Sequence, residues 1–179
     1  MKKTFFILPL IILILIYSVF FYFLNTKKNV DIIPSNLINK KAPEFIANSL
    51  ITDKKVKSSK YFNNEIIIVN FFATWCKPCK DEHKFIHLLS EKSNYRILGI
   101  NYKDNSEKAL LWLKKLGNPY SDVVIDNIGK IAIDWGVYGI PETFIVNKTG
   151  NINYRHVGPI NEKIYKEINL KLKKINNYE

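Results

Sequence analysis

The stretch Val69–His83, VNFFATWCKPCKDEH, decides the fold of this chain because it joins an apolar segment to a pair of cysteines. Cys76 and Cys79 are the only two cysteines in 179 residues. The residues Glu65–Ala73 (EIIIVNFFA) form a continuous apolar run rich in β-branched and aromatic side chains, which predicts a strand buried on both faces. A helix is expected to follow over Cys76–Ser90. A buried strand that leads directly into a Cys-x-x-Cys helix indicates a layered α/β domain.

Strand and helix patterns alternate along the rest of the chain. Two further segments have the composition of buried strands, and Ile164–Ile175 places apolar residues at spacings of four, four and three, as in an amphipathic helix. The expected elements, in order, are a short strand within Lys41–Leu50, a loop over Lys54–Asn64, the strand Glu65–Ala73, the helix from Cys76, the strand Arg96–Tyr102, a helix that ends at Gly117, the strand Ser121–Asp126, a short helix over Ile128–Trp135, a hairpin of Thr143–Asn147 and Asn151–Val157, and the C-terminal helix. The helix that ends at Gly117 is expected to be capped by Asn105 or Ser106. Its expected apolar stripe consists of Leu110, Leu113 and Leu116. This order predicts a central mixed sheet, parallel in its main part and bordered on one side by the antiparallel hairpin.

The N-terminal segment is long and apolar enough to cross a membrane. Phe5–Leu24 holds twenty consecutive uncharged residues, and a helix of that length rises roughly 30 Å, the hydrocarbon thickness of a bilayer. A cleaved signal peptide is the alternative, but the segment runs into Asn25–Lys28 without an Ala-x-Ala cleavage pattern. An uncleaved signal anchor is therefore favoured. The lysines on its two sides bias the N-terminus only slightly toward the cytoplasm.

The chain accordingly divides into four parts. Residues 1–4 are a cytoplasmic N-terminus, residues 5–24 a transmembrane signal anchor, residues 25–40 a polar linker, and residues 41–179 the folded domain. A long domain is translocated with little regard to its own charge, so the chemistry of the cysteines must help to decide on which side of the bilayer it lies.

The net charge of +11 does not indicate a nucleic-acid partner. The lysines are scattered over linkers and helix faces, and Arg96 and Arg155 are the only arginines for bidentate phosphate or base contacts. A solvated basic surface explains this distribution, and weak attraction to the nearby membrane is the alternative. No nucleic acid is expected among the partners.

The spacing of the two cysteines favours thiol-disulfide exchange. A strand followed at once by Cys-x-x-Cys places Cys76 in the first turn of a helix, where unpaired N–H groups and the helix dipole lower the pKa of a thiol. Cys79 then lies one turn later on the same face, close enough to form a disulfide. The expected chemistry is attack by Cys76 on a substrate disulfide and resolution of the mixed disulfide by Cys79. These two residues are the predicted catalytic pair.

A zinc site and an inert structural disulfide are the alternatives. With His83 and His87 the order is C-x2-C-x3-H-x3-H, but four ligands along one continuous helix cannot converge tetrahedrally. A bridge that closes so short a loop gains little stability from loop entropy. Redox chemistry is therefore the favoured interpretation, and neither a metal nor a cofactor is expected.

Trp75 before the first cysteine and Pro78 between the pair resemble the active sites of thioredoxin-like proteins. Their structural alternatives, a core aromatic and a first-turn helix proline, are compatible with that role. Gly139–Thr143 (GIPET) supplies a second element of the resemblance. In thioredoxin-like folds an Ile-Pro bond before the hairpin strand is cis, faces the cysteines and binds an extended substrate through its backbone. The resemblance implies a cis bond at Ile140–Pro141 and a three-layer α/β/α thioredoxin-like fold.

Longer stretches resemble one family more closely. The stretches that carry this resemblance are, in order, ATWCKPCKDEH, GINYKDNSEKALLWLKKLGNPY, GVYGIPETFIVNKTG and NYRHVG. They resemble the CcmG or DsbE family, whose members are membrane-anchored thioredoxin-like proteins of cytochrome c maturation. It covers roughly Lys41–Leu172 and also fits the anchor. The resemblance implies an oxidoreductase of the bacterial inner membrane whose domain faces the periplasm. Such a protein reduces the heme-attachment cysteines of apocytochrome c, or a mixed disulfide with a maturation partner, and receives electrons from a membrane thiol reductant of the DsbD or CcdA type.

The same resemblance implies roles for single residues. Cys76 is the nucleophile, Cys79 the resolving thiol and Pro141 the cis proline. Tyr138 is either a wall of the substrate groove or part of the core. The residues expected to contact the substrate are Trp75, Ile140, Pro141, Glu142 and Glu82.

Glu82 and Glu142 have a physical use near the cysteines. A buried negative charge raises the free energy of the Cys76 thiolate, which lowers the reduction potential and favours a reductant. For each glutamate the alternative is an ordinary solvated side chain. Lys77 departs from the small or polar residue often seen at its position, and its positive charge counters part of this effect.

Two rival functions remain open. A general periplasmic disulfide oxidase or isomerase would carry the cysteine pair at a higher reduction potential, which equilibration against glutathione would reveal. A noncatalytic adaptor that docks apocytochrome would keep its function when Cys76 is replaced by serine.

Overall fold

The computed structural model describes residues 2–25, 36–62, 64–92 and 95–178. The chain forms two compact units, Met1–Pro34 and Ser35–Glu179. In the first, helix α1 spans Lys2–Asn25, and its segment Ile7–Asn25 has a mean hydropathy of 2.7 and exposed side chains throughout. This helix fits a single-pass membrane anchor. Most of the predicted linker, residues 26–35, lies outside the described part of the chain.

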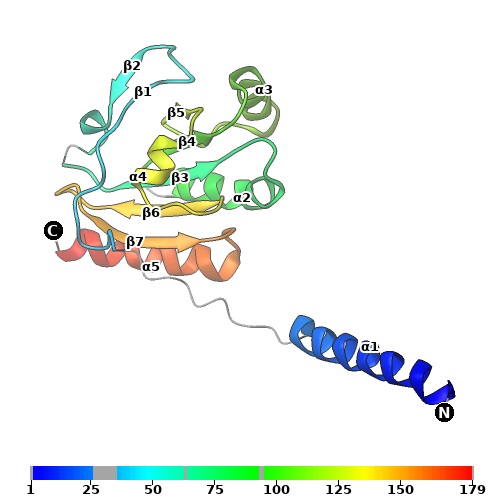
Figure 1. Ribbon diagram of the computed structural model, residues 1–179. Helices are drawn as coiled ribbons and strands as arrows, with labels where there is room; N and C mark the ends of the chain where they lie inside the picture. The colour runs from blue at the N-terminus through cyan, green and yellow to red at the C-terminus, as the bar shows by residue number, and fades with distance from the viewer. Residues whose placement is uncertain (1, 26–35, 63, 93–94, 179) are drawn as a thin grey trace. The chain divides into compact units, whose positions relative to one another are not determined.

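The second unit is built on a five-stranded mixed sheet (Figure 1). Its strands, in spatial order, are β5 (Asp122–Asp126), β4 (Arg96–Tyr102), β3 (Ile67–Phe72), β6 (Glu142–Val146) and β7 (Ile152–Val157). Strands β3, β4 and β5 are parallel, whereas β6 is antiparallel to β3 and β7 is antiparallel to β6. The expected mixed sheet with its antiparallel hairpin is confirmed.

Apolar side chains on both faces of the sheet place the helices in two outer layers. Ile68 of β3 belongs to a core cluster that it shares with α2 (Lys77–Lys92), α3 (Ser106–Leu116) and α5 (Glu162–Tyr178). Ile67, the preceding residue, belongs to a second cluster, which α4 (Lys130–Asp134), the adjacent Trp135 and the segment before β3 cover. Because alternate residues of a strand point to opposite faces, a continuous apolar run suits β3, whose six residues are all buried. The result is the three-layer α/β/α arrangement.

The segment before β3 is more ordered than its composition indicates. Strand β1 (Ile46–Asn48) pairs antiparallel with β2 (Lys55–Lys57), which lies where a loop was predicted. A 3-10 turn, η1 (Ser58–Lys60), follows. Asp122 of β5 anchors this region, because its carboxylate accepts hydrogen bonds from Ser49 Oγ and Tyr61 Oη, each at 2.7 Å. These partners are far from Asp122 in the sequence, so local periodicity gives no sign of them.

Residues 37–40 pack against the domain although the sequence places them in the linker. Leu37 and Ile38 contact the second core cluster, and the Asn39 N–H donates to the Ile152 carbonyl at 2.7 Å. The apolar pair explains why this part of a polar segment is held to the sheet.

Helix α3 begins and ends where the sequence predicts, but one residue of its expected apolar stripe faces solvent. Asn105 caps the helix by accepting from the Lys108 N–H at 2.9 Å, and Gly117 follows the last turn with φ +88°. Leu113 is buried, whereas Leu110 is 44% exposed and Ala109 takes its place in the core. The prediction for Leu110 is wrong because Ala109 and Leu113 are spaced by four residues and so share the inner face.

Candidate active site

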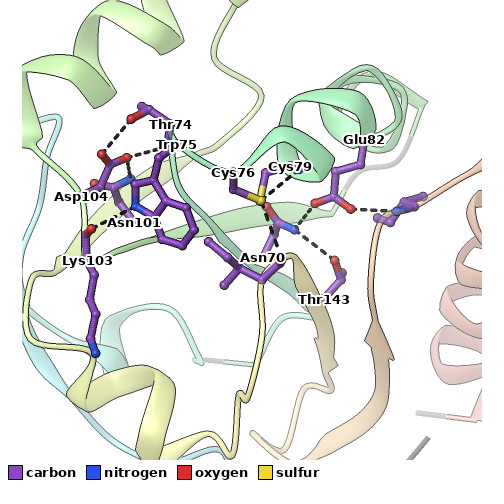
Figure 2. Close-up of a disulfide and its surroundings, with 12 residues drawn as sticks. Asn70, Thr74, Trp75, Cys76, Cys79, Glu82, Asn101, Lys103, Asp104 and Thr143 are labelled. Carbon is purple, nitrogen blue, oxygen red and sulfur yellow. Dashed lines mark hydrogen bonds between the residues drawn. A yellow bond between two sulfur atoms is a disulfide. The ribbon is translucent and has the colours of Figure 1, made fainter. Parts of the chain in front are cut away.

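The two cysteines form a disulfide at the N-terminal end of α2. Cys76 immediately precedes the helix, and its Cα atom lies 5.3 Å from that of Cys79. The backbone N–H of Cys79 donates to Cys76 Sγ at 3.1 Å (Figure 2). An N–H group directed at this sulfur stabilises a negative charge there once the disulfide is reduced, as the unpaired amides of a helix N-terminus do. Cys76 is 5% exposed and Cys79 is 2% exposed, so both residues are buried and Cys76 is slightly the more exposed.

The loop before β6 faces the disulfide through its backbone. The peptide bond between Ile140 and Pro141 is cis, as the resemblance implies. The Ile140 carbonyl oxygen lies 3.7 Å from Cys76 Sγ. The Pro141 carbonyl accepts from the Gly158 N–H at 2.9 Å, which fixes the loop to the end of β7. Ile140 therefore presents a backbone edge next to the sulfur that a substrate would meet first.

Glu82 lies on α2, one turn after Cys79, and is 1% exposed. Its Oε1 accepts from Asn70 Nδ2 at 2.9 Å and its Oε2 accepts from the Ile160 N–H at 2.8 Å. Burial raises the pKa of Glu82 from 4.5 to about 7, although both hydrogen bonds favour the ionised form and oppose this rise. The alternative of a solvated Glu82 is wrong. With a pKa of about 7, the Glu82 carboxyl group is partly protonated and partly ionised at neutral pH.

Asn70 connects Glu82 to two hydroxyl groups. Its Nδ2 also donates to Thr143 Oγ1 at 3.1 Å, and its Oδ1 accepts from the Tyr120 hydroxyl at 2.9 Å. Figure 2 shows Asn70 between Glu82 and Thr143, below the disulfide. Neither Asn70 nor its two hydroxyl partners, Thr143 and Tyr120, were found from the sequence. One signal was available for Asn70, because it is the single polar residue inside the apolar run of a strand buried on both faces.

Glu142 is also buried, but its charge is paired. The Arg155 guanidinium contacts Glu142 Oε2 at 2.7 Å, and the Tyr138 N–H donates to Oε1 at 3.2 Å. Burial raises the pKa of Glu142, and Arg155 opposes that rise. The alternative of a solvated Glu142 is wrong. This residue does not offer a free negative charge to the groove, because it is held between β7 and the loop that carries Ile140.

Arg155 orders the rest of the same loop. It donates to the Gly136 carbonyl at 2.9 Å, and its guanidinium lies 5.0 Å from the centre of the Tyr138 ring. Tyr138 is 57% exposed, which places it on the surface and not in the core. Arg155 was not predicted to be a residue of the site.

Asp104 holds the segment that precedes the cysteines. Its carboxylate accepts from the Thr74 N–H at 2.6 Å, the Thr74 hydroxyl at 2.8 Å and Asn101 Nδ2 at 3.0 Å (Figure 2). Burial alone would raise the pKa of Asp104, but these hydrogen bonds hold it below its ordinary value. Trp75 follows, with its indole N–H donating to the Lys103 carbonyl at 3.1 Å and its side chain 59% exposed. Trp75 thus offers an aromatic surface beside Cys76.

His83 is used in helix packing. Its Nε2 lies 3.0 Å from the Gly117 carbonyl oxygen, and its ring packs edge to face on Trp112 with centres 4.4 Å apart. Burial lowers the pKa of His83. Within the described residues, no group of three or more His, Cys, Asp or Glu side chains is arranged to hold a metal ion.

Comparisons with known proteins agree with this geometry. The family model described as Redoxin matches residues 37–171. The thiol:disulfide interchange protein DsbE of Tatumella citrea is 37% identical over 171 residues, which cover 93% of this chain and 92% of the relative. The thiol:disulfide interchange protein CycY of Rhizobium leguminosarum bv. viciae is 43% identical over 132 residues, covering 74% and 71%.

A solved structure shows the same fold at lower sequence similarity. The crystal structure of a putative DsbE from Chlorobium tepidum superposes with a TM-score of 0.69 at 20% identity, covering 77% of this chain and 96% of that one. The fold, the cysteine pair and the relatives lead to one assignment. The chain belongs to the redoxin family, within the DsbE/CcmG group of thioredoxin-like thiol:disulfide interchange proteins, and it is a thiol-disulfide oxidoreductase.

Proposed function

We propose that this protein is a membrane-tethered periplasmic reductase that opens disulfides of apocytochrome c, or of a partner maturation protein, before heme attachment. The observation that carries the proposal is the buried Glu82 one turn after Cys79, without a cationic partner among the described residues. That arrangement supplies a base for the less accessible thiol and disfavours thiolates at the site.

The first step is attack by Cys76. In the reduced protein the Cys79 N–H and the N-terminus of α2 stabilise the Cys76 thiolate. An extended substrate lies against the backbone of Ile140, which places its disulfide next to Cys76 Sγ. A bond forms between Cys76 Sγ and one substrate sulfur, and the substrate disulfide breaks. The second substrate sulfur leaves with the electron pair of that bond and takes a proton from water.

The second step releases the substrate. Cys79 is almost completely buried, so its thiol proton needs an acceptor within the protein. Glu82, with a pKa near 7, accepts that proton, and the Cys79 thiolate attacks Cys76 Sγ. The mixed disulfide breaks, and the first substrate sulfur leaves with the electron pair of that bond and takes a proton from water. Two electrons have passed to the substrate, and the protein holds the disulfide seen here.

The charge of Glu82 favours a reductant over an oxidant. A carboxylate near the sulfurs raises the free energy of the thiolate and therefore of the reduced form. The expected potential lies closer to that of thioredoxin, about −270 mV, than to that of DsbA, about −120 mV. Lys77 is exposed, so solvent screens its opposing charge.

The anchor and the family suggest the location and the electron donor. Residues 5–24 are proposed to span a bacterial inner membrane, with the thioredoxin-like domain in the periplasm. A membrane thiol reductant of the DsbD or CcdA type is proposed to reduce the Cys76–Cys79 disulfide after each cycle. The direct electron acceptor is proposed to be the heme-attachment cysteines of apocytochrome c or a thiol protein of the same maturation system.

A Cys79→Ser variant expressed as the full chain in cells tests this function. Without Cys79 the mixed disulfide on Cys76 is not resolved, so the partner stays attached and is identified after purification under nonreducing conditions. The matched control is the double variant Cys76→Ser, Cys79→Ser, which should hold nothing. Capture of apocytochrome c or of a maturation thiol protein supports the proposal. Capture of general oxidative-folding substrates, or full cytochrome maturation by the Cys76→Ser protein, contradicts it.

A further inference from the structure

The Asn70 carboxamide is held by hydrogen bonds at each of its polar atoms. Asn70 is fully buried on β3. Its Nδ2 donates to Glu82 Oε1 and to Thr143 Oγ1, and its Oδ1 accepts from the Tyr120 hydroxyl. Both N–H bonds of the amide are thereby used, and the oxygen has a donor. The amide has one orientation in which all of these partners are satisfied together.

That orientation selects the ionised form of Glu82. An N–H group pointing at Oε1 stabilises a carboxylate. The other oxygen, Oε2, already accepts from the Ile160 N–H. A backbone N–H cannot be replaced by an acceptor, whereas a side-chain amide can turn over, so the proton of neutral Glu82 belongs on Oε1, where it meets the N–H of Asn70. Protonation requires the amide to turn over, so that Asn70 Oδ1 accepts from the carboxyl O–H and Nδ2 faces Tyr120.

Tyr120 opposes this turn because its hydroxyl has one proton to donate. Burial and the nearby Glu82 raise the pKa of Tyr120 well above its ordinary value, so the hydroxyl keeps that proton. In the observed orientation the proton goes to Asn70 Oδ1 at 2.9 Å. In the turned orientation the amide presents N–H to a group that is itself a donor, and the buried hydroxyl proton loses its acceptor.

We propose that Tyr120 is a positioning residue for thiol exchange: its hydroxyl fixes the Asn70 carboxamide in the orientation that favours ionised Glu82. Tyr120 thereby favours the ionised form of Glu82, which can accept the proton of the Cys79 thiol. The link to exchange rests on the function proposed above, whereas the effect of Tyr120 on Glu82 stands apart from it.

The other groups around Glu82 do not supply this control. On its own helix, Cys79 is bound in the disulfide and His83 is directed to the Gly117 carbonyl. On β6, Thr143 accepts from Asn70, and the neighbouring Glu142 is paired with Arg155. The segment before α5 contributes a backbone N–H, which does not titrate. No ion pair found among the described residues includes Glu82.

The direct test is the pKa of Glu82 in the Tyr120→Phe variant of the oxidised full-length chain in detergent. The carboxyl stretching band in infrared spectra reports the protonated fraction at each pH, and Glu82→Gln identifies the band. Loss of one buried hydrogen bond is expected to raise the pKa of Glu82 by about 0.5 to 1 unit. Tyr61→Phe is the matched control, because the Tyr61 hydroxyl also donates within the core but to Asp122. It should leave the Glu82 band unchanged.

A second variant keeps the test decisive if phenylalanine disturbs the fold. Incorporation of 3,5-difluorotyrosine at position 120 makes the hydroxyl a stronger donor and preserves the ring. It is expected to lower the pKa of Glu82, the opposite direction to Tyr120→Phe. An unchanged pKa in both folded variants, or a shift in the same direction in both, would overturn the proposal.

The pH profile of exchange separates this inference from the proposed function. With a model disulfide peptide, the pH midpoint of the resolution step should move with the Glu82 pKa in Tyr120→Phe and stay in place in Tyr61→Phe. If the Glu82 pKa shifts and the exchange profile does not, Tyr120 positions Asn70 as inferred but Glu82 is not the base. If neither shifts, the role of Tyr120 is refuted, and the Cys79→Ser capture still decides the function.

Discussion

Replacement of Glu82 by glutamine is expected to remove a pH dependence from the stability of the fold. Burial raises the pKa of Glu82 to about 7 in the folded protein, from 4.5 when the side chain is solvated. A folded-state pKa above the unfolded value means that the folded state holds the proton more tightly. The resulting stabilisation is fully present below pH 4.5 and is lost as the pH rises through 7. The side chain is 1% exposed, so solvent screening does not reduce the effect.

The size of the change follows from the two pKa values. A neutral glutamine does not titrate, so the variant should gain about 2.5 kcal/mol relative to the wild type between pH 5 and pH 8. Urea unfolding of the oxidised full-length proteins in detergent at the two pH values measures this difference. Other titrating groups are present in both proteins and cancel. Glu107→Gln, at an exposed position of α3, is the matched control and should show no such gain.

The same comparison can refute the reasoning. If the stability difference between wild type and Glu82→Gln is equal at pH 5 and pH 8, Glu82 does not carry an uncompensated buried charge. Its role as a proton acceptor near neutral pH would then be lost as well, because that role needs the raised pKa.

Three further predictions concern the frame of the site. Arg155→Met should destabilise the domain by on the order of 3 to 5 kcal/mol in thermal unfolding, because it leaves the buried Glu142 unpaired. It should also slow peptide reduction, because the loop that carries Ile140 loses its support. Asp104→Ala should destabilise the domain by on the order of 2 kcal/mol at pH 7, because the hydrogen bonds to Thr74 are lost. The difference in stability from wild type should shrink in acid, because the lowered pKa of Asp104 gives a stabilisation that disappears below about pH 4. Lys77→Gln should lower the reduction potential by on the order of 10 mV, measured by equilibration against glutathione, and a rise would contradict the assigned charge effect.

Local patterns were sufficient for the main elements of the fold. A continuous apolar run gave β3, because a strand in the middle of a covered sheet has no face left for polar side chains. The cap at Asn105 and the end at Gly117 gave α3 to within a residue. Strand β2 was missed, because Lys55–Lys57 has a single buried residue and is held by its pairing with β1.

The site was predicted where it depends on short spacing and missed where it depends on distant partners. Cys76, Cys79 and the cis bond at Pro141 follow from motifs a few residues long. The contacts of Asn70 with Tyr120 and of Glu142 with Arg155 join segments 50 and 13 residues apart, and no periodicity connects them. A polar residue within a buried strand predicts a hydrogen-bond partner, but the sequence does not identify that partner.

The two buried glutamates near the cysteines differ in one respect that decides their roles. Glu142 has a guanidinium partner, whereas the donors found for Glu82 within the described residues are neutral amides. The arginine partner favours the ionised form of Glu142 and so opposes uptake of a proton by this carboxylate. A base with neutral donors keeps a pKa near neutrality, and it does so because its ionised form is unfavourable in the core. The predicted loss of stability above pH 7 and the proposed proton exchange with Cys79 therefore both follow from one arrangement. If Glu82 is the base for Cys79, a change that shifts its pKa, including loss of the Tyr120 hydroxyl, should shift both the pH dependence of stability and the pH profile of exchange.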